Sequence, residues 1–232
     1  MPTTDWNERW ARDLERFRER RRRGKRGGHY GDHWGDPSLS GLRYLLHRLR
    51  PGTRSIGNLS KVVRDHLEPY VRPDSVVLEI GAGGGRWTQY LIAARKVVVA
   101  ELNPAFFGYL RKRFKRHEEK LRFYETSGYE LDGIDRESID FVFSFGTFVH
   151  IDPEGIDAYL GEIHRVLRPG GNATLQYADR TKPYFQKRET WDGFSDMNGP
   201  RMERLLAARG FTVVEHDESL LKHSNVVVFQ RP

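Results

Sequence analysis

Short apolar runs alternate with stretches of helical periodicity from residue 76 to the end of the chain. The runs are rich in Val, Ile and Phe, which favour β-strands, and the stretches between them have the apolar spacing of amphipathic helices. Strands that alternate with helices feed a parallel sheet, so the pattern predicts a doubly wound α/β domain. The expected strands span 76–80, 96–100, 121–124, 139–145 and 172–177, and the expected helices span 86–94, 104–116, 154–167 and 199–209.

Two further β-rich runs, 211–215 and 225–230, close the chain. The loop between them is too short for a crossover helix, so we expect the two strands to pair antiparallel. The expected fold class is therefore α/β, with a doubly wound, mostly parallel seven-stranded sheet, an antiparallel C-terminal hairpin and an extra N-terminal helical arm.

The N-terminal region carries helical patterns on a highly charged background. Trp6, Trp10, Leu14 and Phe17 recur every three or four residues and predict a helix with one apolar stripe, and leucines at 42–49 predict a second, shorter helix. We assign residues 1–55 to a basic helical arm and residues 56–232 to the main domain. Two interpretations of the arm stay open: a solvated helix that docks loosely through its two tryptophans, and a lid or partner-binding element.

The positive charge is concentrated in this arm. Residues 1–28 hold ten Lys and Arg against five Asp and Glu, which accounts for +5 of the formal charge of +7. The rest of the chain is close to neutral and has no strong electrostatic reason to bind phosphate. Nucleic acid is therefore the less favoured partner, although the arm keeps it open.

Composition narrows the remaining classes. The chain has no cysteine, which excludes disulfides, thiolate metal sites and a cysteine nucleophile. No apolar stretch approaches the 18 or so residues of a membrane span, and the basic N-terminus is not followed by the apolar core of a signal peptide. We expect a cytoplasmic protein without a membrane span; the oligomeric state is open, with a homodimer as one alternative.

A glycine-rich turn follows the first strand. Residues 81–85 read Gly-Ala-Gly-Gly-Gly, where glycine permits positive φ and the next helix start offers N–H groups to an anion. The dinucleotide fingerprint needs a third glycine, but Arg86 and Thr88 stand at the two positions where it would fall. Glu79, just before the turn, would repel a pyrophosphate and suits a cationic α-amino group. The turn thus favours an amino-acid nucleoside over a dinucleotide.

The second strand ends in Glu101, twenty residues after Gly81. A carboxylate at that edge of the sheet can accept hydrogen bonds from both hydroxyls of a ribose. The alternative is a surface glutamate that begins the next helix. We favour the ribose interpretation because of the buried strand that precedes Glu101.

Five ordered motifs over about residues 56–178 resemble those of class I S-adenosylmethionine-dependent methyltransferases. Residues 79–85 are similar to their E-x-G-x-G-x-G motif, Glu101 to their ribose-binding acid, 126–131 to the loop over the adenine, 139–145 to the fourth motif, and 167–171 to the turn before the fifth strand. Ser127 stands where many members have Asp. The resemblance implies S-adenosyl-L-methionine as cofactor, and it implies these cofactor-binding residues: Glu79, Gly81, Ala82, Gly83, Trp87, Thr88, Glu101, Leu102, Ser127, Gly128, Tyr129, Glu130, Ser144, Phe145 and Gly146.

The resemblance places the methyl acceptor at the loops after the fourth and fifth strands. His150 is the candidate general base, because histidine titrates near neutral pH and Asp152 lies close enough in sequence to orient its ring. Alternatively, His150 packs against the adenine loop or caps the next helix. The candidate substrate-contacting residues, which include a glycine-rich run that forms either a lid or an ordinary turn, are His29, Tyr30, His33, Trp34, Tyr177 and Arg180.

The spacings of His and Asp match no specific metal site, so we predict no metal. The function expected is methyl transfer to a small-molecule acceptor, with a hydroxyl as the favoured group. An RNA methyltransferase that uses the arginine-rich arm is a second hypothesis, although the fourth motif has Ser144 and Phe145 where amino-methylating DNA enzymes carry a Pro-Pro-Tyr segment. A non-catalytic cofactor-binding protein is the third.

Overall fold

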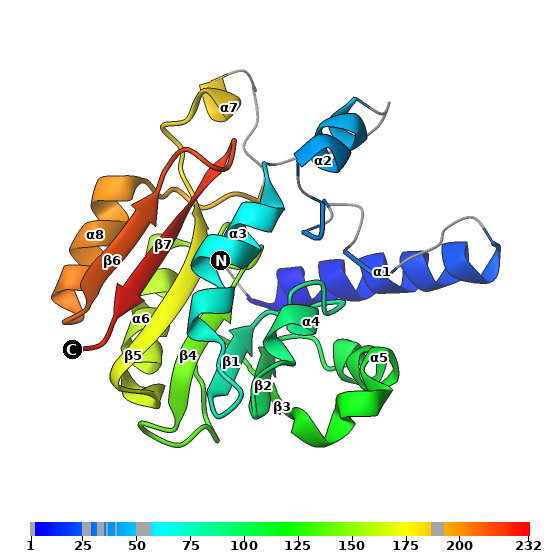
Figure 1. Ribbon diagram of the computed structural model, residues 1–232, viewed down its shortest axis with the longest axis horizontal. Helices are drawn as coiled ribbons and strands as arrows, with labels where there is room; N and C mark the ends of the chain where they lie inside the picture. The colour runs from blue at the N-terminus through cyan, green and yellow to red at the C-terminus, as the bar shows by residue number, and fades with distance from the viewer. Residues whose placement is uncertain are drawn as a thin grey trace.

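The protein is built around one twisted seven-stranded sheet (Figure 1). The structure, a computed structural model, describes residues 3–24, 29–31, 35, 37–39, 41–49, 57–186 and 193–232. The strands lie in the order β3-β2-β1-β4-β5-β7-β6. Their bounds are β1 (Val76–Ile80), β2 (Lys96–Glu101), β3 (Leu121–Glu125), β4 (Ile139–Ser144), β5 (Leu167–Ala178), β6 (Thr212–Asp217) and β7 (Ser224–Gln230).

Helices cover both faces of the sheet. Buried side chains of α6 and α8 pack on one face, and those of α3, α4 and α5 pack on the other. The helices are α1 (Thr3–Arg22), α2 (Gly41–Arg48), α3 (Leu59–His66), α4 (Thr88–Leu91), α5 (Ala105–Arg113), α6 (Pro153–Val166), α7 (Pro183–Gln186) and α8 (Gly199–Ala208), with 3-10 turns η2 (Glu68–Tyr70) and η3 (Lys115–Lys120). None of them, within the described ranges, is long and apolar enough to cross a bilayer.

The central strands are buried on both sides. In β1, Leu78 and Ile80 contribute to the core under α6 and α8, whereas Val77 contributes to the core under α3, α4 and α5. A strand that is buried on both faces has apolar residues at nearly every position, so its sequence predicts a strand clearly. The two cores therefore hold the sheet from both faces.

The sheet confirms the predicted fold class. Strands β3, β2, β1, β4 and β5 pair in parallel, and β6 pairs antiparallel with β7 as the closing hairpin. Strand β7 inserts between β5 and β6 and is antiparallel to both. Strand β5 is longer than predicted, because the turn at 167–171 is drawn into the ladder through a register shift against β4.

Two predicted helices are shorter than expected. The helix expected at 86–94 is reduced to α4. On its N-terminal side residues 83–87 form turns, which include Gly85 with a φ of 77°, and on its C-terminal side the chain turns at residues 92–93. The helix expected at 104–116 ends at Arg113, and a 3-10 turn with non-helical dihedrals at His117 follows it. Both changes concern element ends and leave the topology as predicted.

The arm helix α1 docks on the main domain. Leu14 and Phe17 are buried and pack with Tyr30 and Phe106 in a small separate core. The partly buried ring of Trp10, one of the two tryptophans expected to dock, packs against the same core. Leu14 and Phe17 supply the buried part of the contact, because they occupy the middle of the stripe that faces α5. The side chain of Trp6 lies outside the described part of the chain.

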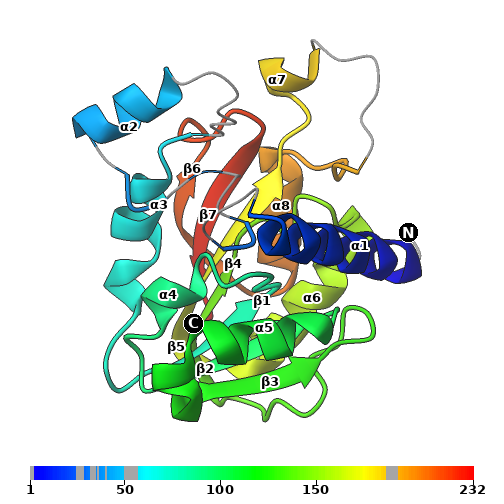
Figure 2. The ribbon, with the colours of Figure 1, turned by 90° about the vertical axis from the view of Figure 1, so that its right-hand side faces the viewer.

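Helix α1 spans the carboxyl edge of the sheet. At one end the Trp10 ring lies 5.8 Å from the ring of His150, after β4. Towards the other end Arg18 donates a hydrogen bond to the carbonyl of Ala105, at the start of α5, over 3.3 Å. Figure 2 shows this helix lying across the molecule above α5. The arm thus covers the edge at which the cofactor site was predicted.

Candidate cofactor and acceptor site

The glycine turn at residues 81–85 packs closely against Thr147, after β4, and against Tyr30 of the arm. Gly81, Gly83 and Gly85 adopt positive φ angles of 75°, 51° and 77°, which side chains other than glycine rarely accept. A Cβ on Gly81 would lie 2.0 Å from Oγ1 of Thr147, whereas one on Gly83 would meet no atom within 4 Å. The backbone of the turn therefore has free space beside Gly83, whereas neighbouring atoms pack closely against Gly81, Gly84 and Gly85.

Glu101 reaches this open backbone from the end of β2. Its Oε2 accepts a hydrogen bond from the N–H of Gly83 at 2.9 Å, and its Oε1 accepts one from the N–H of Asn103 at 3.2 Å. Burial raises the pKa of the Glu101 carboxyl, while the backbone hydrogen bonds work in the opposite direction. A buried acceptor group thus stands at the carboxyl edge, as predicted for a ribose-binding acid.

Glu79 is buried one strand away, in β1. The hydroxyl of Thr88 donates to its Oε2 at 2.6 Å. Burial raises the pKa of Glu79 to about 8, against the lowering effect of that hydrogen bond. A cationic group brought to this carboxyl would favour its charged form. The chemistry of Glu79 therefore fits a ligand with an α-ammonium group, as the sequence indicated.

The predicted adenine loop is held by α6. The Tyr159 hydroxyl donates to the carbonyl of Gly128 at 3.0 Å, and the Tyr129 ring fills the space beside Gly155, where a Cβ would lie 2.4 Å from that ring. Ser127 donates to Glu130 over 3.4 Å. Aromatic side chains thus hold the loop against α6, and the side chains of Ser127 and Glu130 are exposed.

Several predicted cofactor residues lie in the core. Ser144 is buried and donates to the carbonyl of Ile80 at 2.8 Å, and the rings of Trp87 and Phe145 pack with centroids 4.3 Å apart. The N–H of Gly146 is bonded to Oε1 of Gln176 at 2.8 Å. These contacts join the carboxyl ends of β1, β4 and β5. In the described structure Trp87 and Ser144 are therefore buried residues that pack beneath the carboxyl edge of the sheet.

His150 lies at the opposite end of this edge. Its ring packs between Trp10 and Phe194, with centroid distances of 5.8 and 5.5 Å. Its Nδ1 contacts the carbonyl of Gly193, which can only accept a hydrogen bond. Burial lowers the pKa of His150 to about 4, so the imidazole is neutral at pH 7. A neutral ring that donates from Nδ1 carries its lone pair on Nε2.

Asp152 has a different role from the one predicted. Its carboxylate accepts a hydrogen bond from the N–H of Gly155 at 2.8 Å and caps the N-terminus of α6. Pro153 occupies the first helical position, which makes Asp152 the cap residue. The contact described for Nδ1 of His150 comes from Gly193, so the expectation that Asp152 orients the ring is corrected. The helix-capping role considered for His150 also falls to Asp152.

His29 and Tyr30 lie near the glycine turn. The Tyr109 hydroxyl accepts a hydrogen bond from the N–H of Tyr30 at 3.0 Å and lies 3.1 Å from Nδ1 of His29. A Cβ on Gly84 would lie 2.3 Å from the carbonyl oxygen of Tyr30. The arm is thus seated against the cofactor turn. His33 and Trp34 fall outside the described residues.

Tyr177 lies in β5, and Arg180 comes shortly after the end of that strand. The Tyr177 ring is fully buried, with its hydroxyl 2.5 Å from Nε2 of His216 and in receipt of a hydrogen bond from Asn225 at 3.1 Å. The Arg180 guanidinium lies 5.5 Å from the centroid of the Phe185 ring. Burial of Tyr177 in the sheet core speaks against the predicted substrate contact, because its side chain points to the face covered by α6 and α8.

Sequence reasoning missed two residues beside His150. Trp10 was noted only as part of the apolar stripe of the arm, and Phe194 only as one aromatic of the segment after β5. Each meets His150 from more than 40 positions away in the chain, so no local spacing could reveal the contact. Within the described ranges, no three His, Asp or Glu side chains gather in a way that could hold a metal ion.

The mostly parallel seven-stranded sheet with helices on both faces defines a Rossmann-like class of protein. Residues 77–171 match the family model described as a methyltransferase domain. The central part of the chain is therefore a class I S-adenosylmethionine-dependent methyltransferase domain. Its glycine turn, Glu79 and Glu101 fit that cofactor by their donor and acceptor chemistry.

Curated relatives match the same region. A polyketide synthase–nonribosomal peptide synthetase of Pyricularia oryzae is 31% identical over 112 residues, 44% of this chain and 3% of that protein. An uncharacterised methyltransferase-like protein of Schizosaccharomyces pombe is 30% identical over 117 residues, 49% of this chain and 43% of that protein. The chain thus covers less than half the length of each of these relatives.

A solved structure resembles the chain more widely. The Burkholderia thailandensis 1,6-didemethyltoxoflavin-N1-methyltransferase, with bound 1,6-didemethyltoxoflavin and S-adenosylhomocysteine, superposes with a TM-score of 0.55 at 27% identity. The match covers 74% of this chain and 76% of that one. The fold around the cofactor edge is shared with an enzyme whose bound product identifies S-adenosylmethionine as the methyl donor.

Proposed function

We propose that the protein transfers the methyl group of S-adenosylmethionine to a small-molecule acceptor, with a hydroxyl oxygen as the nucleophile. The observation that carries the choice of oxygen is His150, whose neutral ring is fixed by Gly193 at the cofactor edge. Support for a small acceptor comes from the solved neighbour, whose bound 1,6-didemethyltoxoflavin is a small molecule. The proposal assigns the acceptor to the space bounded by His150, Trp10 and Phe194.

When bound, the cofactor supplies an activated methyl group on a sulfonium. Glu79 and Glu101 would hold its polar ends, and the Nε2 atom of His150 would accept the proton that the acceptor hydroxyl loses. The Gly193 carbonyl stabilises the resulting imidazolium through the Nδ1–H hydrogen bond. Trp10 and Phe194 exclude water from the ring and provide flat surfaces for an acceptor.

A nitrogen acceptor is the second candidate, favoured by one observation. The solved neighbour is named as an N1-methyltransferase. A neutral nitrogen nucleophile needs no proton removed before attack, so His150 would be dispensable for it. The effect of replacing His150 therefore separates the two acceptor classes. A cytoplasmic location and the oligomeric state, with a homodimer as one alternative, stay predictions.

The first test is cofactor binding and turnover by the full chain. We expect saturable binding of S-adenosylhomocysteine in calorimetry. We also expect formation of that product when the protein is given S-adenosylmethionine and a panel of phenols, sugars and heterocyclic amines. Lack of cofactor binding would contradict the catalytic proposal altogether. Binding without turnover on the panel, but with turnover on an RNA oligonucleotide, would replace the small-molecule acceptor by RNA.

A further inference from the structure

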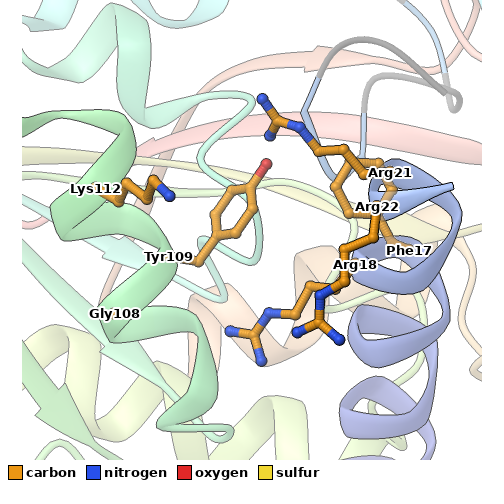
Figure 3. A pocket seen from close by; sticks show the side chains of 7 residues that line it. All are labelled: Phe17, Arg18, Arg21, Arg22, Gly108, Tyr109 and Lys112. Carbon is orange, nitrogen blue, oxygen red and sulfur yellow. The ribbon is translucent and has the colours of Figure 1, made fainter. Parts of the chain in front are cut away.

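A pocket of about 530 Å³ lies between α1 and α5, outside the proposed cofactor site. Figure 3 shows side chains of α1 projecting across it towards α5. Residues of the glycine turn, the adenine loop and the His150 region do not line it. Its lining residues are Phe17, Arg18, Arg21, Arg22, Gly108, Tyr109 and Lys112.

The pocket is strongly basic. Arg18, Arg21 and Arg22 share one face of α1 because residues three and four apart are neighbours on a helix, and Lys112 faces them from α5. Among the described residues that line the pocket, none is acidic. Four cations held around one space repel each other, and this repulsion is relieved when an anion enters.

Local acids compensate this charge only in part. Glu15 is the carboxylate paired with two of the arginines, at 3.4 Å from Arg18 and 3.8 Å from Arg22, and it is half exposed. Arg21 and Lys112 have no carboxylate within ion-pair distance among the residues that the structure describes. Such exposed pairs contribute little, so most of the positive potential of the pocket remains for a ligand.

The size and the aromatic wall indicate the kind of ligand. A volume of about 530 Å³ lies within the range of small-molecule sites, roughly 300–1,000 Å³. Phe17 and Tyr109 provide apolar ring surface beside the cations. Arginine guanidinium groups match phosphate oxygens in paired hydrogen bonds. Several cations with two rings suit a molecule that carries more than one phosphate and a flat group.

The pocket is mechanically connected to the cofactor turn. The Tyr109 ring lines it, while the Tyr109 hydroxyl accepts the hydrogen bond from the N–H of Tyr30. The carbonyl of Tyr30 lies against Gly84 of the glycine turn. Arg18 also donates to the carbonyl of Ala105. A ligand held between Arg21 and Lys112 would bridge α1 to α5 and so press the arm against the turn.

We propose that this pocket binds a small polyphosphorylated molecule and that the bound ligand fastens the arm over the cofactor turn. The ligand acts as an anionic bridge: its phosphates pair with Arg18, Arg21 and Arg22 from α1 and with Lys112 from α5. By linkage, a ligand that prefers the fastened arm also raises the affinity for any cofactor that needs it.

The test uses the full chain and inorganic pyrophosphate as the probe, titrated in calorimetry at constant ionic strength. We expect saturable one-to-one binding. Arg21→Gln and Lys112→Gln should each weaken it by at least about tenfold, because each removes a charge-assisted contact. Arg20→Gln is the matched control, since Arg20 is an exposed cation of the same helix that does not line the pocket. It should change the affinity by less than about twofold, the effect of a distant surface charge.

Hydrogen exchange measures the fastening separately. Pyrophosphate should slow the exchange of the α1 amides in the wild type and in Arg20→Gln, but not in Arg21→Gln. This readout requires no methyl transfer, so it stays informative if the proposed acceptor is wrong. The titration is repeated with saturating S-adenosylhomocysteine. If pyrophosphate bound in the cofactor site the two ligands would compete, so an unchanged pyrophosphate affinity shows that the probe binds elsewhere.

Three results would overturn the proposal. The first is absence of saturable pyrophosphate binding. The second is equal weakening by Arg20→Gln and Arg21→Gln, which would indicate a diffuse basic surface. The third is binding of a single-stranded RNA oligonucleotide with the same losses in both variants and no protection of α1 by pyrophosphate, which would assign the arm to nucleic acid.

Discussion

The carboxylate of Glu101 accepts a hydrogen bond from the backbone N–H of Gly83 at 2.9 Å. This bond joins the end of β2 to the turn after β1, the two places in the chain that most strongly indicated the cofactor. Gly83 has open space around its Cα, so the turn presents its backbone rather than a side chain at this point. The position of Glu101 is thereby fixed by the backbone of the glycine turn.

Replacement of Glu101 by Gln should weaken S-adenosylhomocysteine binding by roughly ten- to a hundredfold. The amide keeps the size of the side chain but replaces a charged acceptor of ribose hydroxyls, worth about 1.5–3 kcal/mol, by a weaker one. Calorimetry on the folded variant measures the change. Glu125→Gln is the matched control, because Glu125 is the exposed neighbour of Glu101 in the β2–β3 ladder. Equal affinities of wild type and Glu101→Gln would remove Glu101 from the cofactor site.

The sequence marked this half of the site because its signals are local. A buried apolar strand, a run of glycines and an acid at the end of the next strand each lie within a few residues, and parallel strands bring their carboxyl ends to one edge. The direction in which a side chain of a strand points, to one face of the sheet or the other, was harder to predict from the sequence. Tyr177 lies near the carboxyl end of the correct strand, β5, yet its ring points into the core under α6 and α8.

The acceptor half could not be predicted to the same extent. Trp10 and Phe194 come to His150 through the docking of the arm and of the segment after β5, which are tertiary events with no periodic signature. Asp152 shows the reverse case. Its place before Pro153 is a strong local signal for a helix cap, and that signal outweighs its closeness to His150 in sequence.

The buried carboxyl of Glu79 should make the ligand-free protein less stable as the pH rises. Its pKa is raised from 4.5 to about 8 on folding, so the folded state binds the proton that the unfolded state loses. The contribution of protonated Glu79 to the free energy of unfolding is therefore fully present below about pH 4.5. It falls as the pH rises towards 8, and above that pH the free energy of unfolding no longer changes through Glu79. We expect the free energy of unfolding to drop by a few kcal/mol, as an order of magnitude, across this window.

Thermal unfolding between pH 5 and 9 measures this dependence as the difference between wild type and Glu79→Gln. The amide cannot titrate, so the difference cancels the other groups. Saturating S-adenosylmethionine should flatten the wild-type curve at high pH, because its ammonium group would favour the charged carboxylate. Parallel curves for wild type and variant, with and without the cofactor, would show that Glu79 does not titrate in this range.

His150→Gln should lower turnover with a hydroxyl acceptor by at least about a hundredfold, the usual contribution of a general base. Its affinity for S-adenosylhomocysteine should stay within about threefold of wild type, because the described contacts of His150 lie with Trp10, Gly193 and Phe194.

Since burial lowers the pKa of His150 to about 4, kcat/KM of the wild type should rise with pH through that value and be flat from about 5 to 8. His117→Gln, at an exposed position of η3, is the control. Unchanged turnover in His150→Gln with a nitrogen acceptor would favour the second candidate function.

Gly84→Ala should lift the arm from the cofactor turn. Gly84 has no positive φ, so the substitution adds no backbone strain, but the new Cβ would lie 2.3 Å from the carbonyl oxygen of Tyr30. Relief of this overlap requires residues 29–31 to move, at a cost of about 1–3 kcal/mol, which is typical of overpacking. We expect faster hydrogen exchange throughout α1 and weaker binding of S-adenosylhomocysteine. Gly161→Ala is the control, since Gly161 lies in α6 away from the arm, its new Cβ would meet only the flexible end of the Arg209 side chain at 3.2 Å, and alanine favours the helix. Normal protection of α1 in Gly84→Ala would mean that the arm does not depend on its contact with the turn.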